Sequence, residues 1–312
     1  MAIRITEGIA YRTALSSMQR TTADLGKTQL QLSTGQKFQT AAEDPTAAAQ
    51  VQNLNAQLAN LVARNKTLDT ARLALQTENQ ALTDAQNVFS QASTLAVQAG
   101  NPTLSASDRE DLAQQIDSLK IQLTAIANRS DANGKPIFGG GLANGPAFTT
   151  APGGAVSYAG GDQPTWLQVD AAAALPAGDT GREVFMTSSN GDPNTPSTQS
   201  LFKTLDDLSA AIRTADPAQR SAALASSANA LNAGASHITR MATRNGGRLN
   251  ALDTLESAQQ TQATDVQQVR SAVGDVDYAK AASQLTLLST ALQAAQQSFI
   301  KIRSLSLFNF MH

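Results

Sequence analysis

Apolar residues near the start of the chain recur at alternating steps of four and three residues, which is the spacing of a coiled-coil seam. This stripe consists of Tyr11, Leu15, Met18, Thr22, Leu25, Gln29 and Leu32. Gly35 follows the stripe, and glycine is the commonest residue just beyond the C-terminus of a helix. The pattern therefore predicts a first long helix over residues 6–33.

A second stripe is more regular than the first. Asp44 and Pro45 have the residue types of an N-cap and a first helical position. A large apolar residue then recurs every seven residues, at Leu54, Leu61, Leu68, Leu75, Leu82 and Phe89. The column that begins at Leu58 is otherwise polar, so the apolar face is narrow and favours a rod over a globular core helix. We predict a helix over residues 46–98, about 80 Å long.

The chain then breaks at Gly100-Asn101-Pro102 and returns as a third helix. Ser107 and Glu110 have the types and spacing of a capping box, in which each side chain bonds the other's backbone N–H. The rhythm of four and three resumes at Leu112, Ile116, Leu119, Leu123 and Ile126. This pattern predicts an antiparallel helical return.

Between residues 139 and 198 the composition changes to Gly, Pro, Thr and Asp. Thr165, Leu167 and Val169 alternate along the chain, and a short apolar run follows at residues 184–186. Alternation is typical of strands, and glycine-rich flanks are typical of exposed loops. We therefore predict a small β-rich insertion on the surface.

Helical patterns return after the insertion and continue to the end of the chain. One covers residues 201–212, and another begins at Asp216-Pro217, with Gln219 as capping partner, and extends to Val266. The last stripe consists of Leu285, Leu288, Leu292, Ala295, Phe299 and Ile302, followed by Leu305, Leu307, Phe308 and Phe310. Both ends of the chain are thus predicted to be heptad helices.

These elements predict a mainly α fold with a small β-rich insertion. Its frame is a long rod of heptad helices in which the N- and C-terminal helices pair. The predicted division is an assembly region at 1–45, a helical rod at 46–138, the outer insertion at 139–198, a rod return at 199–265 and a second assembly region at 266–312.

The two ends are expected to need a partner. The first helix carries only five clear apolar anchors, too few to offset the backbone entropy lost in ordering it. Gly8 and Gly26 lower its helix propensity further. We expect the ends to become stable helices on assembly, through an interface of Tyr11, Leu15, Met18, Leu25, Leu32, Leu285, Leu288, Leu292, Phe299, Ile302, Leu305, Leu307, Phe308 and Phe310.

Composition argues against several other classes of protein. The net charge of -2 provides no basic stripe for nucleic acid, and the chain has no cysteine and only two histidines. We expect His237 on a helix surface, and we expect no enzyme activity, cofactor or metal. The alternative that the insertion is a hydrolase is not supported by any catalytic motif in the sequence. The start lacks the apolar run of a cleaved signal, and no stretch is apolar enough for membrane insertion.

Five segments resemble the bacterial flagellin family and, within it, the hook-filament junction proteins more than flagellin itself. They are LQLSTG at 30–35, AAEDPTAAA at 41–49, NGKPIFGG at 133–140, DVDYA at 275–279 and SLSLFNF at 304–310. The resemblance implies an extracellular axial protein whose subunits form a ring between the first junction protein on the hook and the flagellin filament. It also implies unfolded export without a cleaved signal peptide, and a cytoplasmic export chaperone on the C-terminal helix. The alternative is a short flagellin that forms the filament itself.

Overall fold

The computed structural model describes residues 2–131, 133–141, 145–168, 174–186 and 200–308, with the backbone alone for 2–8, 10 and 302–308. The helices are α1 (Ala2–Thr34), α2 (Pro45–Ala99), α3 (Ala106–Ala127), α4 (Gly181–Phe185), α5 (Leu201–Arg213), α6 (Pro217–Gly274) and α7 (Tyr278–Phe308). The strands are β1 (Phe148–Thr150), β2 (Val156–Tyr158), β3 (Trp166–Gln168) and β4 (Ala174–Pro176). The predicted fold class, mainly α with a small β-rich insertion, is confirmed.

Local capping chemistry sets where the helices begin. Asp44 Oδ1 accepts from the backbone N–H of Ala47 at 2.9 Å, and Asp216 Oδ1 accepts from that of Gln219 at 2.8 Å. The predicted capping box at Ser107 and Glu110 is wrong. The box is formed two residues earlier by Ser105 and Asp108, because a shorter carboxylate closes the same reciprocal pair.

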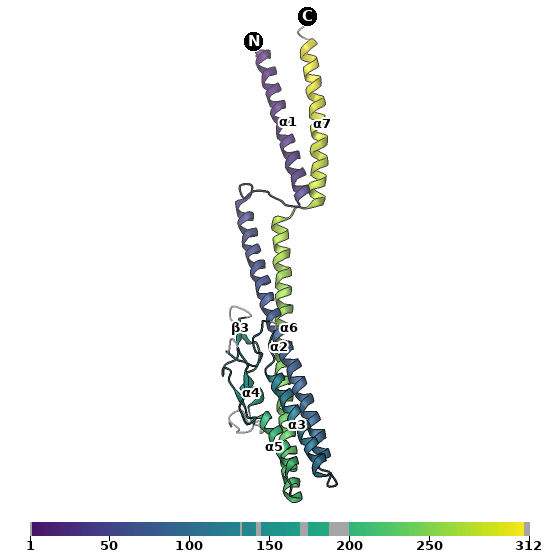
Figure 1. The fold of residues 1–312 in the computed structure, drawn as a ribbon. Coiled ribbons are helices and arrows are strands. Elements are labelled where there is room, and N and C mark those ends of the chain that lie inside the picture. Colours follow the sequence, from purple (N-terminus) through teal and green to yellow (C-terminus); the bar gives the residue numbers. More distant parts are fainter. Residues whose placement is uncertain (1, 132, 142–144, 169–173, 187–199, 309–312) are drawn as a thin grey trace. The chain divides into compact units, whose positions relative to one another are not determined.

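The chain divides into two compact units. The first comprises residues 1–61 and 260–312, and in it α1 and α7 lie side by side in opposite directions (Figure 1). The two loops at their base are joined, because Gly35 O accepts from Val276 N–H and Gly274 O accepts from Lys37 N–H, each at 2.8 Å. The predicted pairing of the terminal helices is confirmed.

Gly35 ends α1 for a conformational reason. Its φ of 72° lies in the left-handed region, which glycine adopts without a steric penalty. Its N–H donates to Gln31 O at 2.9 Å, and a Cβ at this position would lie 2.8 Å from the hydroxyl of Tyr278. The helix stop predicted from the sequence therefore also provides room for the start of α7.

The second unit, residues 62–259, is built on the regular stripe of α2. In this unit the predicted column consists of Leu68, Leu75, Leu82 and Phe89, which are all buried; Leu54 and Leu61 of the same column belong to the first unit and are buried too. The companion column is not the polar one that begins at Leu58, because from Leu68 onward the buried partners lie three residues beyond each member of the column. They are Ala71, Glu78, Ala85, Ala92 and Ala99. The stripe is therefore two columns wide there, and the alanines of the second column let neighbouring helices approach closely.

Helix α6 packs its own seven-residue column into this core. The column contains Leu224, Leu231, Ile238, Asn245, Leu252 and Gln259, all buried. At Gly234 the backbone of α6 lies so close to α2 that a Cβ would be 2.5 Å from Phe89 Cε1. Helix α5 packs against α3 and contributes Leu205, Leu208 and Ile212 to the same core.

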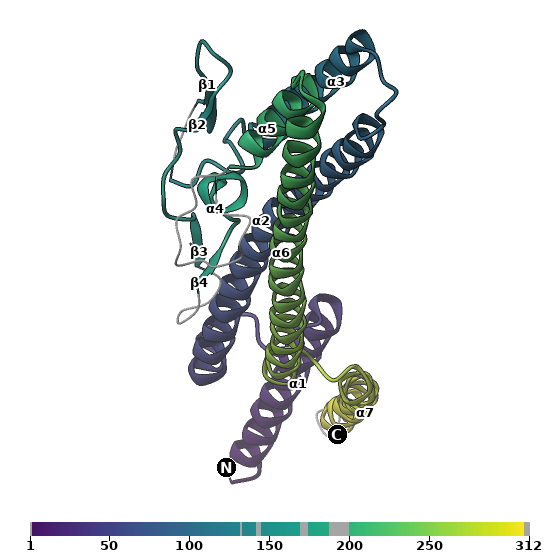
Figure 2. The same ribbon diagram turned by 90° about the horizontal axis from the view of Figure 1, so that it is seen from below.

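Two short antiparallel hairpins, β1-β2 and β3-β4, lie with α4 on one side of the second unit's helices (Figure 2). The run at 184–186, predicted as part of the β-rich insertion, instead lies in and just after α4, because Val184 and Phe185 turn inward toward the helical core. Phe185 contacts Phe138, Phe148 and Phe202, with ring centroids 5.0 to 5.8 Å apart. This aromatic cluster anchors the insertion. Val169 lies outside the described residues.

His237 does not lie on a helix surface, as the sequence predicted, but is buried under α4. Its Nε2 is 3.0 Å from Glu183 O and 3.1 Å from Val184 O, near the end of a helix whose carbonyls lack intrahelical partners. Burial lowers the pKa of the imidazole below its ordinary value. A neutral ring can donate one N–H to these carbonyls and needs no counter-ion.

Candidate assembly interface

The predicted interface residues lie along the paired helices α1 and α7, with unequal exposure. Tyr11 and Leu15 are exposed, whereas Met18, Leu25 and Leu32 are half-buried. On α7 the half-buried ones are Leu285, Leu288, Leu292 and Phe299. The side chains of Ile302, Leu305, Leu307 and Phe308 lie outside the described part, as does all of Phe310.

The α1–α7 contact covers only part of this apolar seam. Tyr11 and Phe299 approach to 5.1 Å between ring centroids. Close to the base of the pair, the small side chains of Thr28 and Ala281 are buried. Between these points the larger leucines stay half-covered, because two helices alone can enclose only a narrow line of contact.

Further apolar side chains on the same two helices face outward, and sequence reasoning missed them. Leu287 is 67% exposed and Ile300 is 65% exposed on α7, and Ile9 and Leu30 are exposed on α1. They fall outside the four-and-three register, so the seam pattern gives no signal for them. Together with the half-covered seam they leave α1 and α7 with uncovered apolar surface on more than one face.

Part of the α7 surface lacks charged side chains, which favours packing against other helices. Residues 281–300 of α7 contain no charged side chain, so an apposed helix would desolvate no ion there. At the base of α1, Lys27 forms an ion pair with Glu43 at 2.8 Å, and that hydrogen bond lowers the pKa of the Glu43 carboxyl. None of the described helices has the length and apolar character needed to cross a membrane. The arrangement suits association with other helices.

A buried cluster of charged groups in the second unit was also missed. Glu78 of α2 is 0% exposed, and both of its carboxylate oxygens lie 3.2 Å from the backbone N of Asp179. Asp179 Oδ1 is 2.8 Å from Arg244 and 2.7 Å from Arg248, both on α6. The sequence held one signal for this cluster, a glutamate within an otherwise alanine column.

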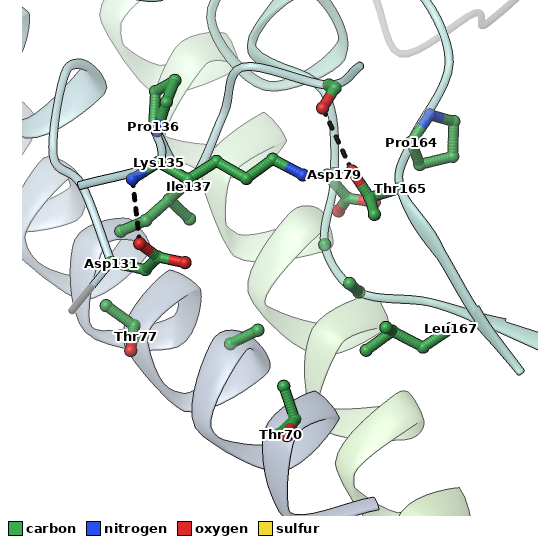
Figure 3. A pocket seen from close by; sticks show the side chains of 14 residues that line it. Thr70, Thr77, Asp131, Lys135, Pro136, Ile137, Pro164, Thr165, Leu167 and Asp179 are labelled. Atoms are coloured by element: carbon green, nitrogen blue, oxygen red, sulfur yellow. Dashed lines mark hydrogen bonds between the residues drawn. The ribbon is translucent and has the colours of Figure 1, made fainter. Parts of the chain in front are cut away.

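The cluster borders a cavity of about 160 Å³ (Figure 3). Asp179 lines it together with Asp131, Lys135 and Thr165. Lys135 extends across the cavity and places Nζ 3.0 Å from Thr165 Oγ1. Among the described residues no group of His, Asp or Glu side chains is arranged to hold a metal ion.

Comparison with known proteins places the chain in a family. The profile of the bacterial flagellin N-terminal helical region matches residues 5–142. Flagellar hook-associated protein 3 of Salmonella typhimurium is 30% identical over 316 aligned residues, which cover 98% of this chain and 99% of that protein. The chain belongs to the flagellar hook-associated protein 3 family. The resemblance inferred from the five sequence segments is thereby confirmed.

Solved structures share the fold of this family member. A flagellar hook-associated protein structure from Vibrio parahaemolyticus aligns with a TM-score of 0.66 at 19% identity, over 74% of this chain and 99% of that one. The flagellar junction protein FlgL from Legionella pneumophila aligns with a TM-score of 0.60 at 19% identity, over 74% of this chain and 100% of that one. Both alignments leave about a quarter of this chain uncovered, although the full-length Salmonella typhimurium relative matches nearly all of it.

Proposed function

We propose that this chain is a structural protein of the bacterial flagellum, in which it forms the junction between hook and filament by coiled-coil assembly of its terminal helices. The observation that carries the proposal is the incompletely covered apolar surface of the α1–α7 pair, where Leu287 and Ile300 are exposed and Leu288 is half-buried. Such a surface is stabilised when adjacent helices exclude water from it. Membership of the hook-associated protein 3 family supports the assignment.

The partners follow from this role. In this proposal, copies of the chain form a ring, with the first hook-filament junction protein on one side and flagellin on the other. The C-terminal helix binds a cytoplasmic export chaperone before assembly in the same proposal, and the chain is exported without a cleaved signal peptide. An apolar helix face that is uncovered in the free chain supports both the chaperone and the ring, because either partner would cover it.

The deciding experiment locates the protein and measures its copy number. Antibody labelling of intact flagella is expected to mark one narrow band at the base of the filament, and deletion of the gene is expected to release unpolymerised flagellin into the medium. Complementation with the wild-type chain controls for effects on neighbouring genes. Labelling along the whole filament, with thousands of copies, would instead identify a short flagellin.

Hydrogen exchange provides a separate test of coupled folding and assembly. In the free chain, amides of Tyr11–Leu32 and Leu285–Ile302 are expected to exchange much faster than those of 71–99 in α2, because most of the described side chains in these ranges are at best partly covered. In isolated flagella the terminal amides are expected to become protected. Equal protection of the ends and of α2 in the free chain would contradict the proposal.

A further inference from the structure

The carboxyl group of Glu78 sits directly beneath the chain segment that leads into α4. Its two oxygens accept from the N–H of Asp179, and a Cβ on Gly178 would lie 2.8 Å from Glu78 Oε2. Among the described residues no lysine or arginine is within ion-pair distance of this carboxyl. Glu78 is thus enclosed by the segment without a direct ion pair, and among the charges described around it only that of Arg248 favours its ionised form.

Asp179 holds the same segment from the other side. Its side chain is 1% exposed, Oδ1 binds both Arg244 and Arg248, and Oδ2 has no hydrogen-bond partner. Two ionised carboxylates at this depth repel each other, and water does not screen them. A proton on Glu78 removes that repulsion and gives it a hydroxyl that can donate to the neighbouring Asp179 carboxylate.

We propose that Glu78 and Asp179 form a proton-dependent latch that fastens residues 177–185, including α4, to helices α2 and α6. The latch is closed when Glu78 is protonated, because Asp179 is then the only charged member of the carboxyl pair and stays ion-paired with Arg244 and Arg248. When Glu78 ionises, its charge is repelled by the Asp179 side-chain carboxylate, and this repulsion opposes the N–H bond that holds the segment. The hairpins and α4 then loosen from the rod helices.

The cavity gives solvent protons a route to the pair, since Asp179 lines it (Figure 3). The charged and titratable groups around Glu78 come from every element packed there. They are Asp179 before α4, Glu183 on α4, Arg244 and Arg248 on α6, and Asp131 and Lys135 on the turn after α3. Arg244 also binds Glu183 of α4 at 2.7 Å, so opening of the latch also disturbs this attachment of α4 to α6.

The direction of the pH effect follows from the environment of Glu78. Desolvation first, and then the charge of Asp179, raise the pKa of Glu78 to about 8. Because this folded-state pKa lies above that of the unfolded chain, the proton favours the folded state. The stabilising contribution is complete below about pH 4.5, decreases as the pH rises, and is lost above about pH 8. The latch is therefore closed at neutral pH and open in mild alkali.

Titration of His237 sets the lower limit of the pH range in which the effect of Glu78 can be measured alone. Its pKa is lowered by burial, so its contribution is present above its ordinary value near 6.5 and is lost as the pH falls through the lowered value. A charged imidazole could still donate to the carbonyls of Glu183 and Val184, but it would be a buried cation close to Arg244. Experiments on Glu78 are therefore placed at pH 7 and above, where His237 does not titrate.

The test compares the full-length chain with Glu78→Gln, which keeps the shape of the side chain but cannot ionise. Hydrogen exchange of amides 177–185 is followed by mass spectrometry at pH 7.0 and pH 9.5, after correction for the intrinsic exchange rate. Protection in the wild type is expected to fall about tenfold at pH 9.5, since the opening constant rises about tenfold per pH unit between pH 7.0 and the pKa of about 8 and levels off above it. In Glu78→Gln the change is expected to stay below twofold.

Two further variants control the result. Glu110→Gln makes the same substitution at an exposed carboxylate paired with Arg213, and it should keep the wild-type fall in protection of 177–185. Asp179→Asn removes the charge that repels an ionised Glu78, so the midpoint of the fall should move to lower pH even if Glu78→Gln does not fold. Wild-type protection that is the same at both pH values, or an unmoved midpoint in Asp179→Asn, would overturn the latch.

Discussion

Leu288→Asp is expected to reduce incorporation of the chain into flagella by at least 100-fold while the unit of residues 62–259 stays folded. Leu288 lies half-buried on the seam of α7, within the uncharged stretch 281–300. Completing that seam with neighbouring helices would bury a carboxylate without a partner, at a cost of several kcal/mol. About 3 kcal/mol already corresponds to a 100-fold change in an association constant.

The measurement has two parts, so that failure to fold is distinguished from failure to assemble. Flagella from a deletion strain complemented with each variant are quantified by immunoblot, and the secreted chain is examined by circular dichroism and thermal unfolding. Leu288→Met is the matched control, because it keeps the apolar character and nearly the volume of leucine. It is expected to assemble normally. Wild-type incorporation of Leu288→Asp would rule out the α7 seam as an assembly surface.

Phe89→Ala is expected to lower the free energy of unfolding of the second unit by about 3 to 5 kcal/mol, the usual range for removing a buried phenylalanine ring. Phe89 is 1% exposed and belongs to the main core cluster. The backbone of α6 at Gly234 lies directly against its ring, so the helices cannot close over the cavity without moving α6 as a whole. The loss should therefore lie well above that of an average substitution.

Urea unfolding followed by circular dichroism measures this change, with the midpoint and slope fitted for the transition of the second unit. Leu73→Ala is the control on the same helix, since Leu73 is 59% exposed and its truncation should change stability by no more than about 0.5 kcal/mol. If the two variants unfold at the same urea concentration, the buried column of α2 does not hold the unit together.

Features that depend on neighbouring residues could be predicted from the sequence, whereas features that depend on distant residues could not. The leucine column of α2, the N-caps Asp44 and Asp216 and the stop at Gly35 were all predictable, because each depends on residues within a turn or two of one another. The run at 184–186 was misassigned for a related reason. Three apolar residues are too few for periodicity to distinguish a strand from a buried helical turn.

The Glu78 cluster shows what local pattern cannot supply. A glutamate in an alanine column can be solvated on a loosely packed helix or buried beside a distant partner, and the column itself does not distinguish the two. Its partner Asp179 lies 101 residues away in the chain. His237 is similar, since its buried contacts are with carbonyls 53 and 54 residues earlier. Only folding brings such groups together.

For the candidate interface, the sequence by itself determined that both ends of the chain carry an apolar seam at heptad spacing, because that spacing is a property of each helix alone. The tertiary structure decided how much of each seam is covered. It pairs α1 with α7, leaves Leu288 half-buried, and turns Leu287 and Ile300 outward. The physical reason is that helix formation depends on neighbouring residues, whereas burial depends on which distant surfaces meet.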